Sequence, residues 1–208
     1  MVSRRPTAGR GAVPGPVRAL PEGYREVHYM NVTQRGVLLW LNLLSLLPLA
    51  VSSMLVFGGL IVYHGRIGAP LVVGGLPQQV PTLVGFGLSL LVLPLHEWIH
   101  GLVMRRCGHT ARYGIKWFML FATSDGGLFR RDEFLRVALA PLVLISVGGV
   151  TLMVFLPMGL AYWVALAVVI NAAGAVGDLW MTVVVARFDS SALVRDEEDS
   201  IRIFSPAP

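Results

Sequence analysis

The stretch Leu93–Arg106, LPLHEWIHGLVMRR, places two histidines and one glutamate inside one of the most apolar parts of the chain. Ionisable side chains are costly in a lipid bilayer unless they pair with one another or coordinate a metal. The stretch therefore indicates a functional site on a transmembrane helix. Because Pro94 lacks a backbone donor, we expect a kink just before the ionisable residues.

The composition also indicates a membrane protein. Of the 208 residues, 55% are hydrophobic and only 14% are charged, which lies outside the usual range of soluble proteins. Four apolar runs are long enough to cross a bilayer as helices of about 20 residues. They cover residues 36–63, 82–104, 134–156 and 159–186. The sequence thus predicts an all-α polytopic membrane protein with about four transmembrane helices.

Three regions follow from this pattern. Residues 1–23 are rich in Pro, Gly and Arg and lack the apolar core of a secretory signal, so we expect a disordered basic tail. Residues 24–188 form the membrane domain, and residues 189–208 form a solvated cytoplasmic tail with a run of acidic side chains. The single cysteine, Cys107, excludes a disulfide framework and a thiol-rich metal site.

Basic residues predict the orientation. The N-terminal region and the segment between the second and third spans are rich in Arg and Lys, whereas the loop between the first two spans contains only Arg66. Cytoplasmic segments carry the excess of basic residues, so both termini are expected in the cytoplasm. The net charge of +5 is attributed to topology and not to nucleic acid, because the basic residues do not form a stacking or groove-reading pattern with interleaved aromatics.

The segment 108–132 has a pattern that is not helical. Tyr113, Ile115, Trp117, Met119 and Phe121 alternate with other residues, and SDGG at 124–127 supplies turn residues before a second short run. This predicts a short β-hairpin on the cytoplasmic side between the second and third helices. An amphipathic loop at the membrane interface is the alternative.

His96, Glu97 and His100 form the motif H-E-x-x-H. Residues four apart lie on one helix face, so both imidazoles can bind one cation while Glu97 reaches a water on it. Zinc lowers the pKa of such a water to roughly 7, and the glutamate accepts its proton as a carbonyl is attacked. In the alternative, the three side chains pair with one another and bridge helices without a metal.

A catalytic zinc site needs a third protein ligand. Asp178 is the only downstream carboxylate within a predicted span, and it lies at a depth similar to that of the two histidines. Asn171, two helical turns earlier, is placed on the same face, where an amide could polarise a substrate carbonyl. For each residue the alternative is a hydrogen bond to a neighbouring helix. We expect His28, His64 and His109 at the surface or at an interface.

The segments HEWIH and NAAGAVGD resemble the metal-binding helices of intramembrane zinc metalloproteases of the site-2-protease type. The closer resemblance, over roughly residues 20–188, is to a family of small bacterial membrane proteins described as "putative zincin peptidase". It implies a Zn²⁺-dependent peptidase of a bacterial plasma membrane, with His96, His100 and Asp178 as ligands and Glu97 as base. Here the spacing from Asn171 to Asp178 is one residue shorter than usual in the site-2 type, and no proline intervenes.

The sequence therefore predicts a zinc-dependent integral membrane endopeptidase whose substrate is a membrane or membrane-associated protein. A non-catalytic membrane scaffold or partner-binding protein with a structural metal or polar cluster is the main alternative. A metal or proton transporter is a further one, although the chain has no evident internal repeat.

Overall fold

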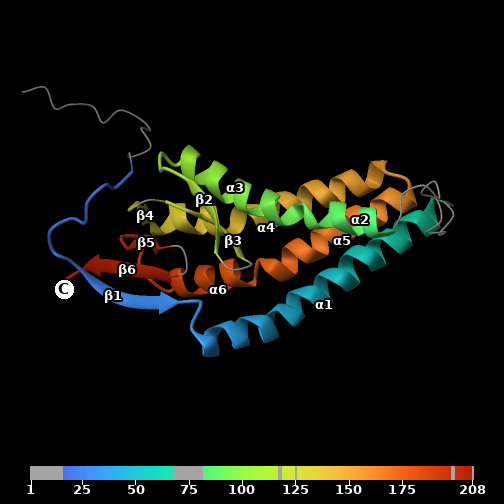
Figure 1. Cartoon of the computed structure of the whole chain (residues 1–208). Helices are drawn as coiled ribbons and strands as arrows, with labels where there is room; N and C mark the ends of the chain where they lie inside the picture. Colours follow the sequence, from blue (N-terminus) through green and yellow to red (C-terminus); the bar gives the residue numbers. More distant parts are fainter. Residues whose placement is uncertain (1–15, 68–81, 117–118, 125, 198–199, 208) are drawn as a thin grey trace, which may run out of the picture.

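A bundle of helices extends from a β-sheet at one end of the molecule (Figure 1). The structure is a computed structural model and describes residues 16–67, 82–116, 119–124, 126–197 and 200–207. The C terminus lies at the sheet end, together with the first strand (Figure 1).

Six helices form the bundle in the described part of the chain. They are α1 (Arg35–Arg66), α2 (Thr82–Leu90), α3 (Val92–Arg106), α4 (Arg131–Phe155), α5 (Met158–Gly174) and α6 (Val176–Val185). Within the described residues, α1, the α2–α3 unit and α4 are long and apolar enough to cross a membrane, and α5 with α6 makes a fourth candidate if this bent pair is one span. The predicted spans agree with these helices.

Two of the predicted spans are interrupted near the candidate site. The second breaks at Leu91, between α2 and α3. A proline ring clashes with the carbonyl four residues earlier, which for Pro94 is that of Leu90, so the break lies where the sequence predicts a kink. The fourth bends by 42° between Gly174 and Val176, and this bend was not predicted.

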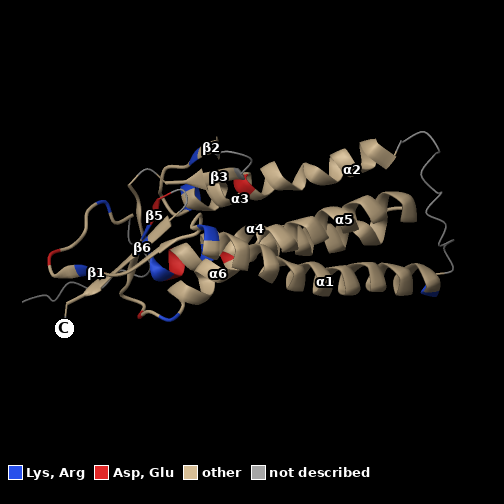
Figure 2. Cartoon of the chain, turned by 60° about the horizontal axis from the view of Figure 1, so that its bottom comes forward, with Lys and Arg blue, Asp and Glu red and all other residues tan. Residues whose placement is uncertain are grey.

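Charged side chains gather at the sheet end, whereas the helices away from it are nearly free of charge (Figure 2). The helices expose large apolar residues such as Leu39, Leu47, Met54 and Val147. Such an apolar surface suits contact with lipid, and it accounts for the small fraction of buried residues in these helices.

The fold is not all-α. A four-stranded antiparallel sheet has the order β1 (Tyr24–Asn31), β6 (Ser200–Pro206), β5 (Leu193–Glu197) and β4 (Leu128–Arg130). A separate hairpin consists of β2 (Arg112–Lys116) and β3 (Met119–Thr123). The sequence predicted only a hairpin, so the four-stranded sheet corrects the expected fold class.

The hairpin is present between the second and third predicted spans, but its strands differ from those expected. The alternating run contains two strands and not one: β2 and β3 pair with each other, and Gly114 lies opposite Phe121. Trp117 of this run lies outside the described residues. A Cβ on Gly114 would lie 2.4 Å from the Phe121 ring, so this glycine makes room for the ring. The expected turn at 124–127 instead leads into β4, which pairs with β5.

The C-terminal region is not a solvated tail. β6 is the central strand between β1 and β5, and its Ile201 and Ile203 are buried with Val194 of β5. These three side chains share a core with residues of α3, α4 and α6, so the sheet is joined to the helices through apolar packing. The acidic run concealed this pattern, although Asp196 and Glu197 are the last two residues of β5 itself.

The N-terminal region also differs from the expected tail. Its first 15 residues lie outside the described part of the chain. Val17, which we expected to be disordered, forms a β-bridge with Leu128, and Leu20 packs with it against a small core at β4, β5 and β6.

Candidate metal centre

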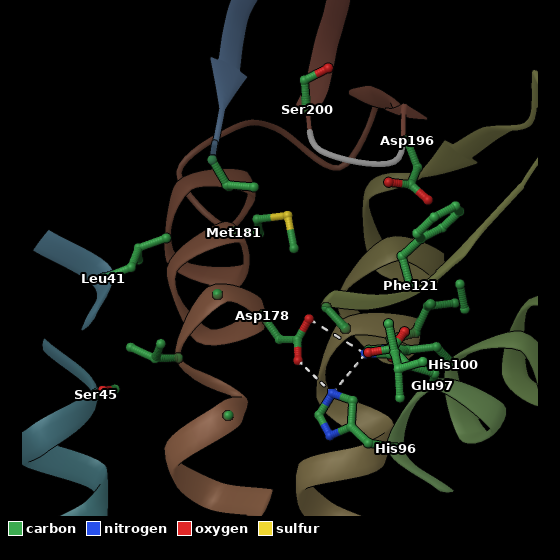
Figure 3. A pocket seen from close by; sticks show the side chains of 18 of the residues that line it. Leu41, Ser45, His96, Glu97, His100, Phe121, Asp178, Met181, Asp196 and Ser200 are labelled. Atoms are coloured by element: carbon green, nitrogen blue, oxygen red, sulfur yellow. Dashed lines mark hydrogen bonds and ion pairs between the residues drawn. The ribbon is translucent and has the colours of Figure 1, made fainter. Parts of the chain in front are cut away.

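Three side chains converge where α3 meets the start of α6. His96 and His100 extend from α3 toward Asp178 of α6 (Figure 3). The Nε2 atom of His96 lies 3.0 Å from Asp178 Oδ2 and 3.1 Å from His100 Nε2, and His100 Nε2 lies 3.5 Å from Asp178 Oδ1. The ligand atoms of the three residues all lie within 4.8 Å of one another. The H-E-x-x-H helix and the predicted third ligand thus lie together.

The outer nitrogens of both imidazoles face backbone or amide oxygens. His96 Nδ1 lies 2.8 Å from Asn171 Oδ1, and His100 Nδ1 lies 2.9 Å from the carbonyl oxygen of Val137. Because both oxygens are acceptors, each Nδ1 donates its proton to one of them. In the neutral tautomer that donates from Nδ1, each Nε2 presents a lone pair to the centre of the cluster, as a metal ligand does.

This donor set fits a divalent cation. Two Nε2 lone pairs and a carboxylate that face one another repel unless positive charge lies between them. Ligands of a tetrahedral zinc ion, each about 2.0–2.2 Å from the metal, lie roughly 3.3–3.6 Å apart. The observed separations of 3.0–3.5 Å are close to this spacing. Two imidazoles and one carboxylate also form a ligand set found in catalytic zinc sites with an open position.

Glu97 lies beside the cluster and not within it. Its carboxylate lines the same cavity as the two histidines and Asp178, and it accepts a hydrogen bond from the backbone of Ala122 on β3. The glutamate is therefore held between α3 and the hairpin, next to the position that a metal-bound ligand would occupy. This is the arrangement in which a carboxylate can exchange a proton with such a ligand.

Asn171 lies at the end of α5 and is fully buried, with an exposed fraction of 1%. Its Oδ1 contacts His96, as described above, and its side chain does not line the cavity. The contact corresponds to the interhelical hydrogen bond that was the alternative for this residue. A direct action of Asn171 on a substrate carbonyl stays a prediction without a supporting contact.

The bend between α5 and α6 places these two residues on opposite sides of one imidazole. Asn171 precedes the bend and meets Nδ1 of His96, whereas Asp178 follows it and meets Nε2. Asp178 lies in the first turn of α6, where the helix dipole favours a negative charge. Asn171 and Asp178, which lie on either side of the helix junction, therefore orient His96 through its two ring nitrogens.

A cavity of about 540 Å³ opens onto the cluster. Its walls include Asn42 and Ser45 of α1, residues Leu120–Ala122 of β3, and Met181 of α6. Asp196 of β5 and Ser200 of β6 line it as well, on the side nearer the sheet (Figure 3). The sequence did not identify these two, because only the pairing of β5 with β6 brings the C-terminal region over the cavity.

The other histidines are not part of the cluster. His28 is half-buried against Phe188. His64 and His109 are buried, so of the expected surface or interface positions they do not occupy surface ones. His109 Nε2 lies 3.7 Å from Glu133 Oε2, and burial lowers the pKa of His109 while Glu133 opposes that shift. This pair connects the end of α3 to the start of α4, away from the cavity.

The fold and the cluster define a class of protein: a helical bundle with several membrane-crossing candidates and a buried His-His-Asp group of metal-ligand geometry. Comparison with protein families identifies the family. The model of the family described as "putative zincin peptidase" matches residues 89–193, which include H-E-x-x-H and Asp178. The chain belongs to this family. Neither curated proteins nor solved structures gave a match.

Proposed function

We propose that this protein is a zinc-dependent integral membrane endopeptidase that hydrolyses peptide bonds of membrane or membrane-associated proteins. The observation that carries the proposal is the convergence of His96, His100 and Asp178 beside Glu97 on the wall of one cavity. Membership of the "putative zincin peptidase" family supports metallopeptidase chemistry at this site.

Each residue has a distinct role in the proposal. His96 and His100 bind zinc through Nε2, and Asp178 binds it through a carboxylate oxygen. When bound, zinc supplies a Lewis acid and a water that is acidic enough to react near neutral pH. Glu97 accepts the proton of that water and then delivers it to the leaving amine. Asn171 and the Val137 carbonyl orient the two imidazoles.

The β2–β3 hairpin provides a strand edge that can hold the substrate beside the cavity. Leu120, Phe121 and Ala122 of β3 line the cavity, and among the described residues β3 pairs only with β2. Apart from the Ala122 backbone group that is bonded to Glu97, its other edge can pair with an extended peptide, whose backbone would form hydrogen bonds regardless of side chain. A helical substrate must unwind to expose its peptide carbonyls, and such strand pairing would stabilise the unwound form.

The proposal places the protein in a bacterial plasma membrane with both termini in the cytoplasm. The charged sheet end would then face the cytoplasm (Figure 2), in agreement with the predicted excess of Arg and Lys on that side. The metal cluster lies near this end of the bundle, so the proposed cleavage takes place in the cytoplasmic half of the bilayer or at its surface.

Metal analysis combined with proteolysis tests the proposal. We expect about one zinc ion per purified chain, a large loss of zinc in His96→Ala and in Asp178→Ala, and an unchanged zinc content in Glu97→Gln. Membrane proteomics should show intact proteins that accumulate in cells with Glu97→Gln and not in wild-type cells. Stoichiometric zinc that persists in His96→Ala would contradict the ligand assignment.

The scaffold alternative predicts a different outcome for the same variants. A structural metal does not need a base, so Glu97→Gln would then keep both its zinc and the cellular function. The position of the Glu97 carboxylate on the cavity wall favours the peptidase, because a purely structural cluster has no use for a proton acceptor that is open to a cavity.

A further inference from the structure

The cavity contains a carboxylate that the proposed chemistry does not use. Asp196 lies on β5, and its side chain lines the cavity above Phe121, on the side nearer the sheet (Figure 3). The metal cluster and Glu97 lie deeper, between the helices (Figure 3). Asp196 is therefore at the end of the cavity that the proposed orientation places toward the cytoplasm.

Two groups at the end of β3 hold this carboxylate in position. It accepts hydrogen bonds from the Thr123 side chain and the Ser124 backbone. Burial nevertheless raises the pKa of Asp196 to about 6, because those neutral donors do not replace the solvation that the charge has lost. At neutral pH the carboxylate is ionised, and among the described side chains no Lys or Arg holds it in an ion pair.

The charges around the cavity do not balance. Within the described residues its lining includes Glu97, Asp178 and Asp196, and no Lys or Arg. A divalent cation at the cluster would compensate for Asp178 and Glu97, and imidazoles that bind it through Nε2 would be neutral ligands. One negative charge then remains, and it is that of Asp196.

A membrane substrate presents positive charge at this depth. Transmembrane segments are commonly followed on the cytoplasmic side by Lys and Arg, which set their orientation. A segment whose backbone reaches Glu97 in the cavity would bring its next cytoplasmic residues toward Asp196. Asp196 therefore lies where the residues that follow such a transmembrane segment are basic.

We propose that Asp196 binds a positively charged group of the substrate, a Lys or Arg side chain or a free amino terminus, on the cytoplasmic side of the cleaved bond. This inference rests on the proposed endopeptidase function and adds the substrate class to it. Asp196 is a specificity-determining residue in this scheme, because it contacts the substrate away from the reacting atoms.

A set of synthetic peptides tests the proposal with the full-length protein in detergent. Each peptide has an apolar segment of about 20 residues, followed at one position by Lys, Arg, Met or Glu, and each is made with a free and with an acetylated amino terminus. Zinc-loaded wild type is expected to cleave the Lys and Arg peptides with kcat/KM about tenfold above that for Met. If peptides with a free amino terminus were cleaved faster than acetylated ones, the terminal ammonium group would be the group that Asp196 binds.

Asp196→Asn keeps one acceptor oxygen for the Thr123 and Ser124 donors and removes the charge. We expect this variant to lose the preference for basic peptides while its kcat/KM for the Met peptide stays within about twofold of wild type. Asp196→Lys should favour the Glu peptide. In the control Asp189→Asn, which removes an exposed carboxylate outside the cavity, the wild-type preference should persist.

Two results would overturn the proposal. One is an absence of charge preference in the wild type. The other is an equal loss of cleavage for the Lys and Met peptides in Asp196→Asn, which would show that Asp196 only fastens β5 to β3.

Binding measurements separate this inference from the proposed function. The same peptides, labelled with a fluorophore, are titrated against Glu97→Gln protein, which cannot act as a peptidase in our scheme. Tighter binding of the Lys peptide that disappears in Glu97→Gln/Asp196→Asn supports the role of Asp196 even if no peptide is cleaved by the wild type. A lack of cleavage by the wild type would then count against the endopeptidase alone, and equal affinities would count against Asp196.

Discussion

At the scale of single residues, His96 shows how neighbouring polar groups prepare a side chain for a metal. Its Nδ1 lies 2.8 Å from Asn171 Oδ1, and its Nε2 points toward Asp178. An oxygen acceptor at Nδ1 selects the tautomer with a free lone pair at Nε2, and it also fixes the plane of the ring. Asn171 is thus better suited to positioning His96 than to contacting a substrate.

Substitution of Asn171 tests this role. In Asn171→Ala the imidazole loses its acceptor, so we expect zinc affinity to fall by about ten- to a hundredfold, measured by competition with a chelator. Asn171→Asp keeps the acceptor and should retain near wild-type zinc affinity and cleavage. If Asn171 acted on the substrate carbonyl through its amide, Asn171→Asp would bind zinc normally but have a much lower kcat.

At the scale of elements, two consecutive glycines of α4 have different surroundings. A Cβ on Gly149 would lie 2.3 Å from Val168 Cγ2 of α5, whereas a Cβ on Gly148 would meet no atom within 4 Å. Small residues let transmembrane helices approach closely, so Gly149 sets the distance between α4 and α5. α5 in turn presents Asn171 to His96, so the packing of α4 on α5 affects the position of a group at the candidate site.

The pair of glycines provides a matched comparison. Gly149→Ala should destabilise the protein by about 1–3 kcal/mol, because Val168 and the facing helix must move. Gly148→Ala should be neutral or slightly stabilising, since alanine favours a helix more than glycine does. Thermal unfolding in detergent, followed by circular dichroism, measures both. Equal unfolding temperatures for the two variants would contradict the close packing of α4 on α5.

At the scale of the whole molecule, the sheet joins distant parts of the chain at one end of the bundle. β6 lies between β1, which precedes α1, and β5, which follows α6. This arrangement places both β1 and β6 on the side where charged residues gather (Figure 2). Arg66, at the end of α1, is at the opposite end of the bundle.

Cysteine labelling of cells tests the proposed orientation. In a Cys107→Ser background, Arg66→Cys should react with a membrane-impermeant maleimide added to spheroplasts, because this exposed position is expected outside. Asp189→Cys, also exposed but near the sheet, should react only after the membrane is opened. The reverse pattern would place the sheet and the proposed cleavage on the outer side.

Local patterns in the sequence predicted the spans and much of the cluster. His96 and His100 share a face because they are four residues apart on one helix, and this spacing holds whatever the rest of the fold does. Asp178 followed from depth, since both helices were expected to cross the membrane in the same direction. The helices and the proximity of these three side chains agree with the structure, because hydrophobic length and helical periodicity are properties of a continuous segment.

Other features depended on contacts between distant segments. The sequence by itself determined several long apolar helices, a His-Glu-His motif on one of them and a carboxylate on a later one. Only the tertiary structure decided that the acidic C-terminal region forms two strands, that Asn171 faces His96, and that Asp196 lines the cavity. Strand pairing and side-chain direction depend on which segments meet in space, and no local periodicity encodes that choice.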